Sequence, residues 1–90
     1  HLLPEINAVV HVHHQPLWEQ LLDRVPTTNP DCAYGTPEMA QEIIRLCQQP
    51  LTQEQKIIVM SGHESGILTF GANLNQAGET LLKYLTTILS

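Results

Sequence analysis

The sequence predicts a mixed α/β domain in which helices pack on an antiparallel sheet, and three observations lead to this fold class. Residues 6–13 read INAVVHVH, a run rich in Val and Ile that is typical of a buried strand. Two further strand-like runs, Lys56 to Met60 and Gly66 to Phe70, are separated by the glycine-flanked segment SGHESG, which indicates a hairpin. Between and after these runs, apolar residues recur at helical spacing.

Length and composition limit the chain to one folding unit. Its 90 residues are too few for two domains, since a unit below roughly 40 residues seldom closes a core without staples. With 42% apolar and 14% charged residues, the chain is too apolar to be a disordered tail. Only two strand candidates follow the first, and a strand needs paired neighbours. We therefore expect residues 1–90 to be part of a single domain whose remaining strands lie in a missing N-terminal part.

Charge and cysteine content exclude several classes of partner. Four Lys and Arg against nine Asp and Glu give a net charge of -5, which leaves no cationic surface for nucleic acid. No apolar run approaches the roughly 20 residues that span a bilayer, and the N-terminus lacks a signal pattern. Cys32 and Cys47 are too few for a disulfide framework, so both are predicted to be reduced. We expect a cytoplasmic protein that binds neither membranes nor nucleic acid.

The first two predicted helices begin at prolines. Pro16 opens a short helix that ends before Pro26, and residues 27–35 are predicted to form a loop or a short strand. Thr36, Pro37 and Glu38 combine a cap, a proline and a first-turn acid, which favours a helix that ends before Pro50. The apolar faces of these helices are Trp18, Leu21, Leu22 and Val25 in the first, and Met39, Ala40, Ile43, Leu46 and Cys47 in the second.

The last predicted helix follows the hairpin. A polar linker, Thr52 to Gln55, leads into the hairpin. After it, Asn73 and Gln76 form a plausible cap pair. The helical stripe that follows consists of Leu74, Ala77, Leu81, Tyr84, Leu85 and Ile88.

Histidines are the residues most capable of chemistry. On a strand, His11 and His13 face the same side, so two imidazoles can bind one ion. His63, in the hairpin loop beside Gly62, can add a third if the strand Lys56 to Met60 lies near the first strand. Three imidazoles leave one coordination position open, which is typical of a catalytic zinc site.

Each candidate has a simpler alternative. A His-x-His pair also occurs by chance on solvated strand edges, although buried unpaired histidines are costly. His14 is expected to have a structural or solvent role, and His1 to lie at a frayed end. Glu64 is either a solvated loop carboxylate or a general base or acceptor beside His63. Trp18 and Tyr84 are expected to pack in the core, and the two cysteines to be core or loop thiols.

Three blocks of the sequence resemble a known family. In order and spacing, PEINAVVHVHH, AYGTPEMAQEI and IIVMSGHESGILTFGANLNQAGETLLKYL resemble the C-terminal half of the class II aldolase/adducin family, which includes fuculose-phosphate aldolase and ribulose-phosphate 4-epimerase. The resemblance implies a three-layer α/β/α fold with a mainly antiparallel sheet, assembled as a homo-oligomer, a ring-like tetramer. It implies that His11 and His13 bind Zn²⁺ or another divalent metal, and that a "GTPE" helix start matches Gly35 to Glu38.

The third ligand departs from the family pattern. The family spacing places Ser65 where the histidine is expected, whereas His63 stands two residues earlier. We expect a longer loop to bring His63 into the same place; otherwise the site has lost a ligand.

The resemblance implies a zinc-dependent lyase or isomerase that acts on a small sugar phosphate or hydroxy-ketone through a metal-stabilised enediolate. The catalytic carboxylate is expected upstream of His1, so the fragment alone is expected to be inactive. Glu64 is a secondary candidate. The alternatives are a non-catalytic, adducin-like assembly module with a decayed metal site, and a structural metal site with Glu64 as fourth ligand.

Overall fold

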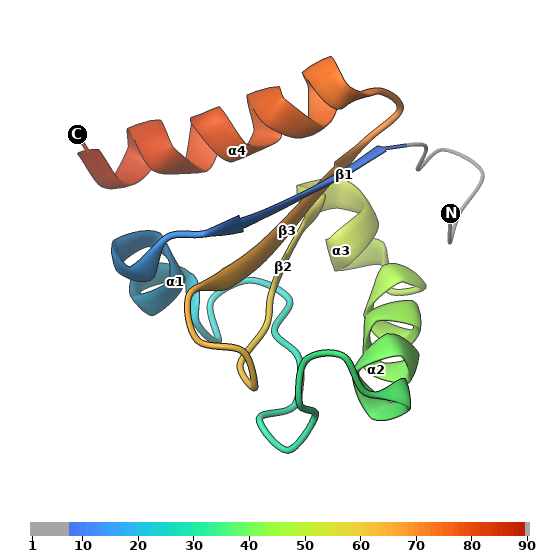
Figure 1. The fold of residues 1–90 in the computed structure, drawn as a ribbon. Coiled ribbons are helices and arrows are strands. Elements are labelled where there is room, and N and C mark those ends of the chain that lie inside the picture. Colours follow the sequence, from blue (N-terminus) through green and yellow to red (C-terminus); the bar gives the residue numbers. More distant parts are fainter. Residues whose placement is uncertain (1–7, 90) are drawn as a thin grey trace.

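A three-stranded antiparallel sheet forms the centre of the computed structural model, which describes residues 8–89. Strand β1 is Ala8–His13, β2 is Ile57–Val59 and β3 is Gly66–Gly71. The strands lie in the order β1-β3-β2 (Figure 1), and both pairs are antiparallel. The strand and hairpin predictions are confirmed, while His1 and the predicted strand's first residues, Ile6 and Asn7, lie outside the described residues.

Within the described residues, four helices pack around the sheet. They are α1 (Gln15–Leu21), α2 (Pro37–Cys47), α3 (Pro50–Gln55) and α4 (Leu74–Leu89). The predicted start of α2 is confirmed, because the Thr36 hydroxyl accepts a hydrogen bond of 3.2 Å from the amide of Met39. The predicted cap pair of α4 is confirmed as well. The Asn73 side chain accepts from the amide of Gln76 at 2.9 Å, and the Gln76 side chain accepts from the amide of Ala72 at 3.0 Å.

Helices cover both faces of the sheet (Figure 1), because alternate strand residues point to opposite sides. On one face, residues of β2, β3 and the segment after β2 pack against α2; the buried members are Met39, Leu46, Cys47, Ile58, Met60, Leu68 and Phe70. On the other face, Ile57 of β2 and Ile67 of β3 are buried together with Leu17 of α1. Partly buried Trp18 of α1 and Tyr84 of α4 pack against them. The packing roles predicted for Trp18 and Tyr84 are therefore confirmed.

Two segments differ from the prediction. Helix α1 ends at Leu21 rather than near Pro26, because Asp23 adopts a left-handed conformation and its amide bonds to the Thr27 hydroxyl at 3.0 Å. The segment Thr52–Gln55, predicted as a linker, belongs to α3, which Pro50 opens. In the predicted apolar stripes, Ala40 of α2 and Leu74 of α4 are exposed rather than buried, and the side chain of Ile88 in α4 lies outside the described part.

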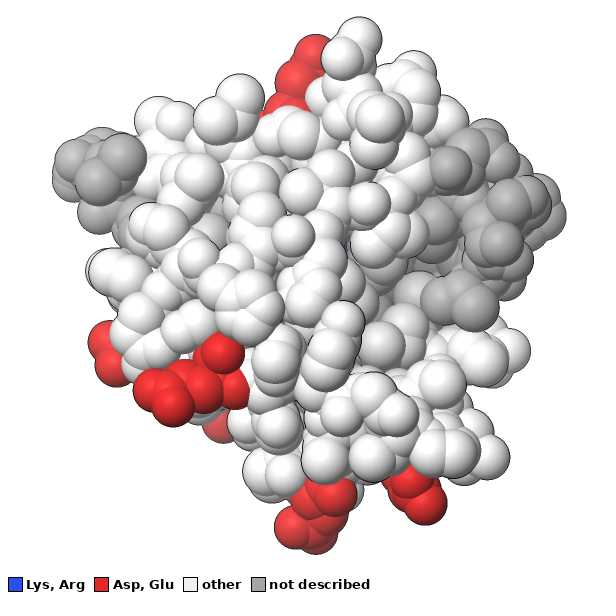
Figure 2. Space-filling view, in the orientation of Figure 1, with Lys and Arg blue, Asp and Glu red and all other residues white. Residues whose placement is uncertain are grey.

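The surface of the molecule shows little positive charge. Figure 2 shows one face with several acidic side chains along its lower and left edges and no Lys or Arg in view. Two of the four cationic residues of the chain, Lys56 and Lys83, line a hollow beside α4 together with Glu79. Within residues 8–89, no helix combines the length and the apolar character that crossing a membrane requires.

Candidate metal centre

Strand β1 presents two imidazoles on one face. Its residues alternate in burial, so that Val9, His11 and His13 are exposed while the residues between them are partly buried. The ring centroids of His11 and His13 lie 5.0 Å apart. Across the sheet, His11 pairs with Leu68 and His13 with Gly66, which begins β3. The pair of imidazoles therefore stands directly beside the loop that enters β3.

That loop carries His63. It is closed by hydrogen bonds from the amide of His63 to the carbonyl of Met60 at 3.2 Å and from the amide of Gly66 to the carbonyl of His63 at 2.9 Å. Ser65 completes the turn in a left-handed conformation, with φ of 67°. The prediction that His63 joins the site depended on the strand Lys56 to Met60 lying near the first strand, but β3 lies between β2 and β1. The register of β3 against β1 is what places the loop.

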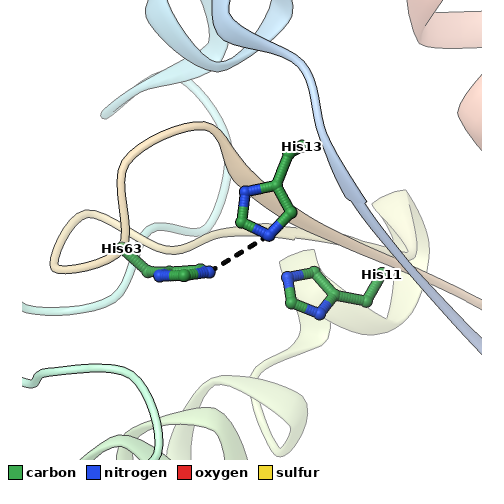
Figure 3. A group of neighbouring side chains, drawn as sticks. All are labelled: His11, His13 and His63. Carbon is green, nitrogen blue, oxygen red and sulfur yellow. Dashed lines mark hydrogen bonds between the residues drawn. The ribbon is translucent and has the colours of Figure 1, made fainter.

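The three imidazoles converge (Figure 3). One nitrogen from each of His11, His13 and His63 lies within 4.8 Å of the other two, and the Nε2 atoms of His13 and His63 are 3.2 Å apart. Two nitrogens bound to one tetrahedral ion, each at 2.0–2.1 Å, are separated by roughly 3.3 Å. The nitrogens of His13 and His63 thus already have the spacing that a shared ion needs, and the nitrogen of His11, within 4.8 Å of both, would have to move closer to complete the site. The donor set fits Zn²⁺.

The electrostatics of the cluster favour neutral rings. Partial removal from water lowers the pKa of His11, and the neighbouring charges of His13 and His63 lower it further. Partial burial, followed by the charge of His13, lowers the pKa of His63 in the same way. Because neutral imidazole is the form that binds metal, the cluster is prepared for a cation at neutral pH.

The structure separates the remaining candidates from this cluster. His14 has a structural role, as expected, since its Nδ1 accepts a hydrogen bond of 3.1 Å from the amide of Leu17 and caps α1. Glu64 is exposed and is not in the group of converging donor atoms. Cys32 and Cys47 are both free thiols, and burial is the main cause that raises the pKa of each. Within residues 8–89, the donor group consists of the three histidines alone.

Tyr34 is a neighbour of the cluster that the sequence did not reveal. Its ring stacks on that of His63 with centroids 4.1 Å apart and an interplanar angle of 17°, and it lies 5.4 Å from the ring of His11. The side chain is nevertheless 53% exposed, so it is not a core residue. In the sequence, Tyr34 is recognisable only as part of the Tyr-Gly-Thr segment that precedes α2. That local pattern does not predict a contact with His63, which is distant along the chain.

Tyr34 also borders an open hollow of about 370 Å³. It is lined by Tyr34, Gly35, Thr36, Met39, Ala40 and Ile43. The hollow has a mainly apolar wall and no cationic side chain among its lining residues. It therefore offers no charge for a phosphate group, and Tyr34 is the lining residue that also contacts the imidazoles.

Comparisons with known families, proteins and structures give no match for this chain. No protein-family model, no curated protein and no solved structure matches it. The features of the chain that bear on its function are therefore the geometry of the three imidazoles and the chemistry of their surroundings.

Proposed function

We propose that this chain is part of a zinc-dependent lyase or isomerase of the class II aldolase type. The observation that supports the proposal is the convergence of His11, His13 and His63 from two remote stretches of the chain. A chance His-x-His pair on a solvated edge gives no reason for a third imidazole to face it. The family kinship, the three-layer α/β/α fold around this sheet and a homotetrameric assembly belong to the same proposal.

Three protein nitrogens suit a catalytic rather than a structural ion. A structural zinc site is closed by four protein ligands, whereas three leave a position for a substrate oxygen. Glu64, the residue expected to close such a site, is exposed and outside the donor group of the described residues. When bound, Zn²⁺ supplies Lewis-acid polarisation of a carbonyl or hydroxyl oxygen and stabilises negative charge that develops beside it.

The residues of the chain itself would hold the metal ion and orient its ligands. His11, His13 and His63 would bind the ion through neutral rings, and the lowered pKa values of His11 and His63 keep these two rings unprotonated at neutral pH. The open position would face a small hydroxy-ketone or sugar phosphate. Proton transfer needs a positioned carboxylate, which we place in the part of the protein upstream of His1.

The free thiols fit a reducing compartment. Neither Cys32 nor Cys47 is paired, and disulfides are rare in the cytosol. A cytoplasmic location is therefore part of the proposal.

Metal analysis and zinc titration of the purified protein test this function. We expect one ion per chain in the wild type and its loss in His13→Ala, because the closest pair of nitrogens is broken. The matched control is His14→Asn, which removes the adjacent imidazole but keeps a side chain that caps helices well. Unchanged stoichiometry in His13→Ala, or no zinc binding by the wild type, would overturn the proposed function and favour the alternative, a non-catalytic assembly module.

A further inference from the structure

We propose that Tyr34 is a positioning residue whose ring face holds the imidazole of His63 in the orientation in which it meets His13. The two rings are nearly parallel, with an interplanar angle of 17° and centroids 4.1 Å apart. Stacked aromatic pairs stabilise a defined ring orientation by more than the area they bury. The inference deepens the proposed function, because the ring that Tyr34 orients is one of the proposed metal ligands.

His63 needs such support because its own position is a loop. Its side chain is only partly buried, and its ring meets that of His13 nearly edge-on, at an interplanar angle of 80°. A loop imidazole can rotate about two side-chain bonds, and a ligand that must first be ordered binds more weakly than one already in place. The flat face of Tyr34 restricts that rotation to orientations parallel to the phenol ring.

The position of Tyr34 is itself fixed on its C-terminal side by the start of α2. Gly35 has φ of 83°, a conformation that favours glycine, and it turns the chain immediately after Tyr34. The Thr36 hydroxyl then donates to the carbonyl of Ala33 at 2.6 Å and accepts from the amide of Met39. The tyrosine therefore sits in a turn whose far end is the cap of an 11-residue helix.

On the N-terminal side of Tyr34, hydrogen bonds and a close backbone contact join the segment that carries Tyr34 to the loop that carries His63. The amide of Ser61 donates a hydrogen bond of 3.0 Å to the Thr28 hydroxyl, and the amide of Thr28 donates one of 2.9 Å to the carbonyl of Val59. A Cβ at Gly62 would collide with the carbonyl of Cys32, so only glycine allows the backbones to approach this closely. The segment that carries Tyr34 is therefore joined to the His63 loop on the N-terminal side of Tyr34 and held by the cap of α2 on its C-terminal side.

Two substitutions at Tyr34 separate stacking from the hydroxyl group. Tyr34→Phe keeps the ring and serves as the matched control, while Tyr34→Leu keeps an apolar side chain without a flat face. We expect Tyr34→Leu to weaken zinc binding roughly 3- to 10-fold, the range of a lost aromatic pair, and Tyr34→Phe to bind as the wild type does. Equal affinities in wild type and Tyr34→Leu would overturn the inference, as would equal losses in the two variants.

Gly35→Ala gives a second variant that leaves the aromatic ring in the chain. A Cβ at Gly35 meets nothing within 4 Å, so the substitution strains only the backbone at φ of 83°. We expect the turn to shift Tyr34 and zinc affinity to fall in the same direction as in Tyr34→Leu. Wild-type affinity in Gly35→Ala would argue against a role for the turn in positioning.

A readout without metal distinguishes failure of this inference from failure of the proposed function. In metal-free protein, the stack should shift the NMR signals of the His63 ring protons upfield, and Tyr34→Leu but not Tyr34→Phe should remove the shift. If the wild type binds no zinc, the proposed function fails, while the metal-free spectra still decide whether Tyr34 orients His63. If the wild type binds zinc and the shift is absent, the positioning role alone is wrong.

Discussion

Gly66 and His63 occupy adjoining space at the entry to β3. A Cβ built on Gly66 would lie 2.6 Å from Cδ2 of the His63 ring and 2.9 Å from the carbonyl oxygen of the same residue. Real Cβ atoms do not approach this closely, so the loop can carry its imidazole at this place only with glycine at position 66. The glycine that ends the loop sequence SGHESG is thus needed to place the His63 ring as well as to form the turn.

Gly66→Ala is therefore expected to displace the His63 ring. The methyl group has to push away either the imidazole or the backbone, which should lower the free energy of unfolding by about 1–3 kcal/mol and weaken zinc binding. Urea unfolding and zinc titration measure the two effects. The control is Gly78→Ala in α4, where a Cβ meets nothing within 4 Å and the free energy of unfolding should rise by about 0.5–1 kcal/mol. Wild-type zinc affinity in Gly66→Ala would contradict the prediction.

Trp18→Phe should loosen the attachment of the His63 loop to α1. The indole Nε1 donates a hydrogen bond of 3.0 Å to the carbonyl of Met60, the same carbonyl that accepts from the amide of His63. Loss of one such bond costs about 0.5–1.5 kcal/mol, and the smaller ring also loses packing against the core, so both effects should lower the midpoint of urea unfolding. Tyr84→Phe is the comparison, because the bond from the Tyr84 hydroxyl to Gln55 is 3.4 Å long and should contribute less. Equal losses in the two variants would argue against this account.

Capping by His14 predicts a difference between two substitutions at that position. His14→Ala removes the acceptor of the Leu17 amide and should destabilise the protein by roughly 0.5–2 kcal/mol. His14→Asn supplies another acceptor and should cost far less. Thermal unfolding of the metal-free variants measures the difference. Both are expected to bind zinc with the wild-type stoichiometry, and loss of the ion from His14→Asn would show that His14 belongs to the site.

The lowered pKa values of His11 and His63 predict how stability depends on pH in the absence of metal. Since each pKa lies below the ordinary value of 6.5, the unfolded chain binds more protons than the folded chain in the interval between the two values. Stability should therefore be complete above pH 6.5 and fall as the pH drops from 6.5 through the folded pKa values. The midpoint of urea unfolding between pH 5 and pH 8 checks this. A double variant, His11→Asn with His63→Asn, should show a flatter profile, and a midpoint that rises on acidification would contradict the prediction.

Local chemistry made much of the fold predictable. The helix α2 begins where Thr36 and Pro37 satisfy its first turn, and α4 begins where Asn73 and Gln76 do the same, because these signals involve neighbours in the chain. The strands β1 and β2 follow from their Val and Ile content, and β3, which reads GILTFG, follows from its apolar and β-branched residues between two glycines. The linker prediction for Thr52 to Gln55 is wrong because a polar six-residue helix has little periodicity, and Pro50, which ends the sequence pattern of α2, also opens α3.

The histidines of the candidate site were predictable as residues but not as an arrangement. The period of a strand places His11 and His13 on one face without any tertiary information. That His63 joins them depends on β3 lying between β1 and β2, a strand order that composition does not specify. The position of Tyr34 beside His63 requires further tertiary contacts, namely a hydrogen bond between the two loops and the close approach of Gly62 to Cys32.

Because His13 pairs with Gly66, the three imidazoles converge only when β1 and β3 pair in this register. Because neighbouring strand residues face opposite ways, sliding β1 by a single position would turn both of its imidazoles toward the α4 side, away from His63. Any cation held by all three rings would thus be captured only by correctly aligned chains. Loading with metal would stabilise that alignment selectively and discriminate against misfolded pairings, independently of whatever reaction the site supports.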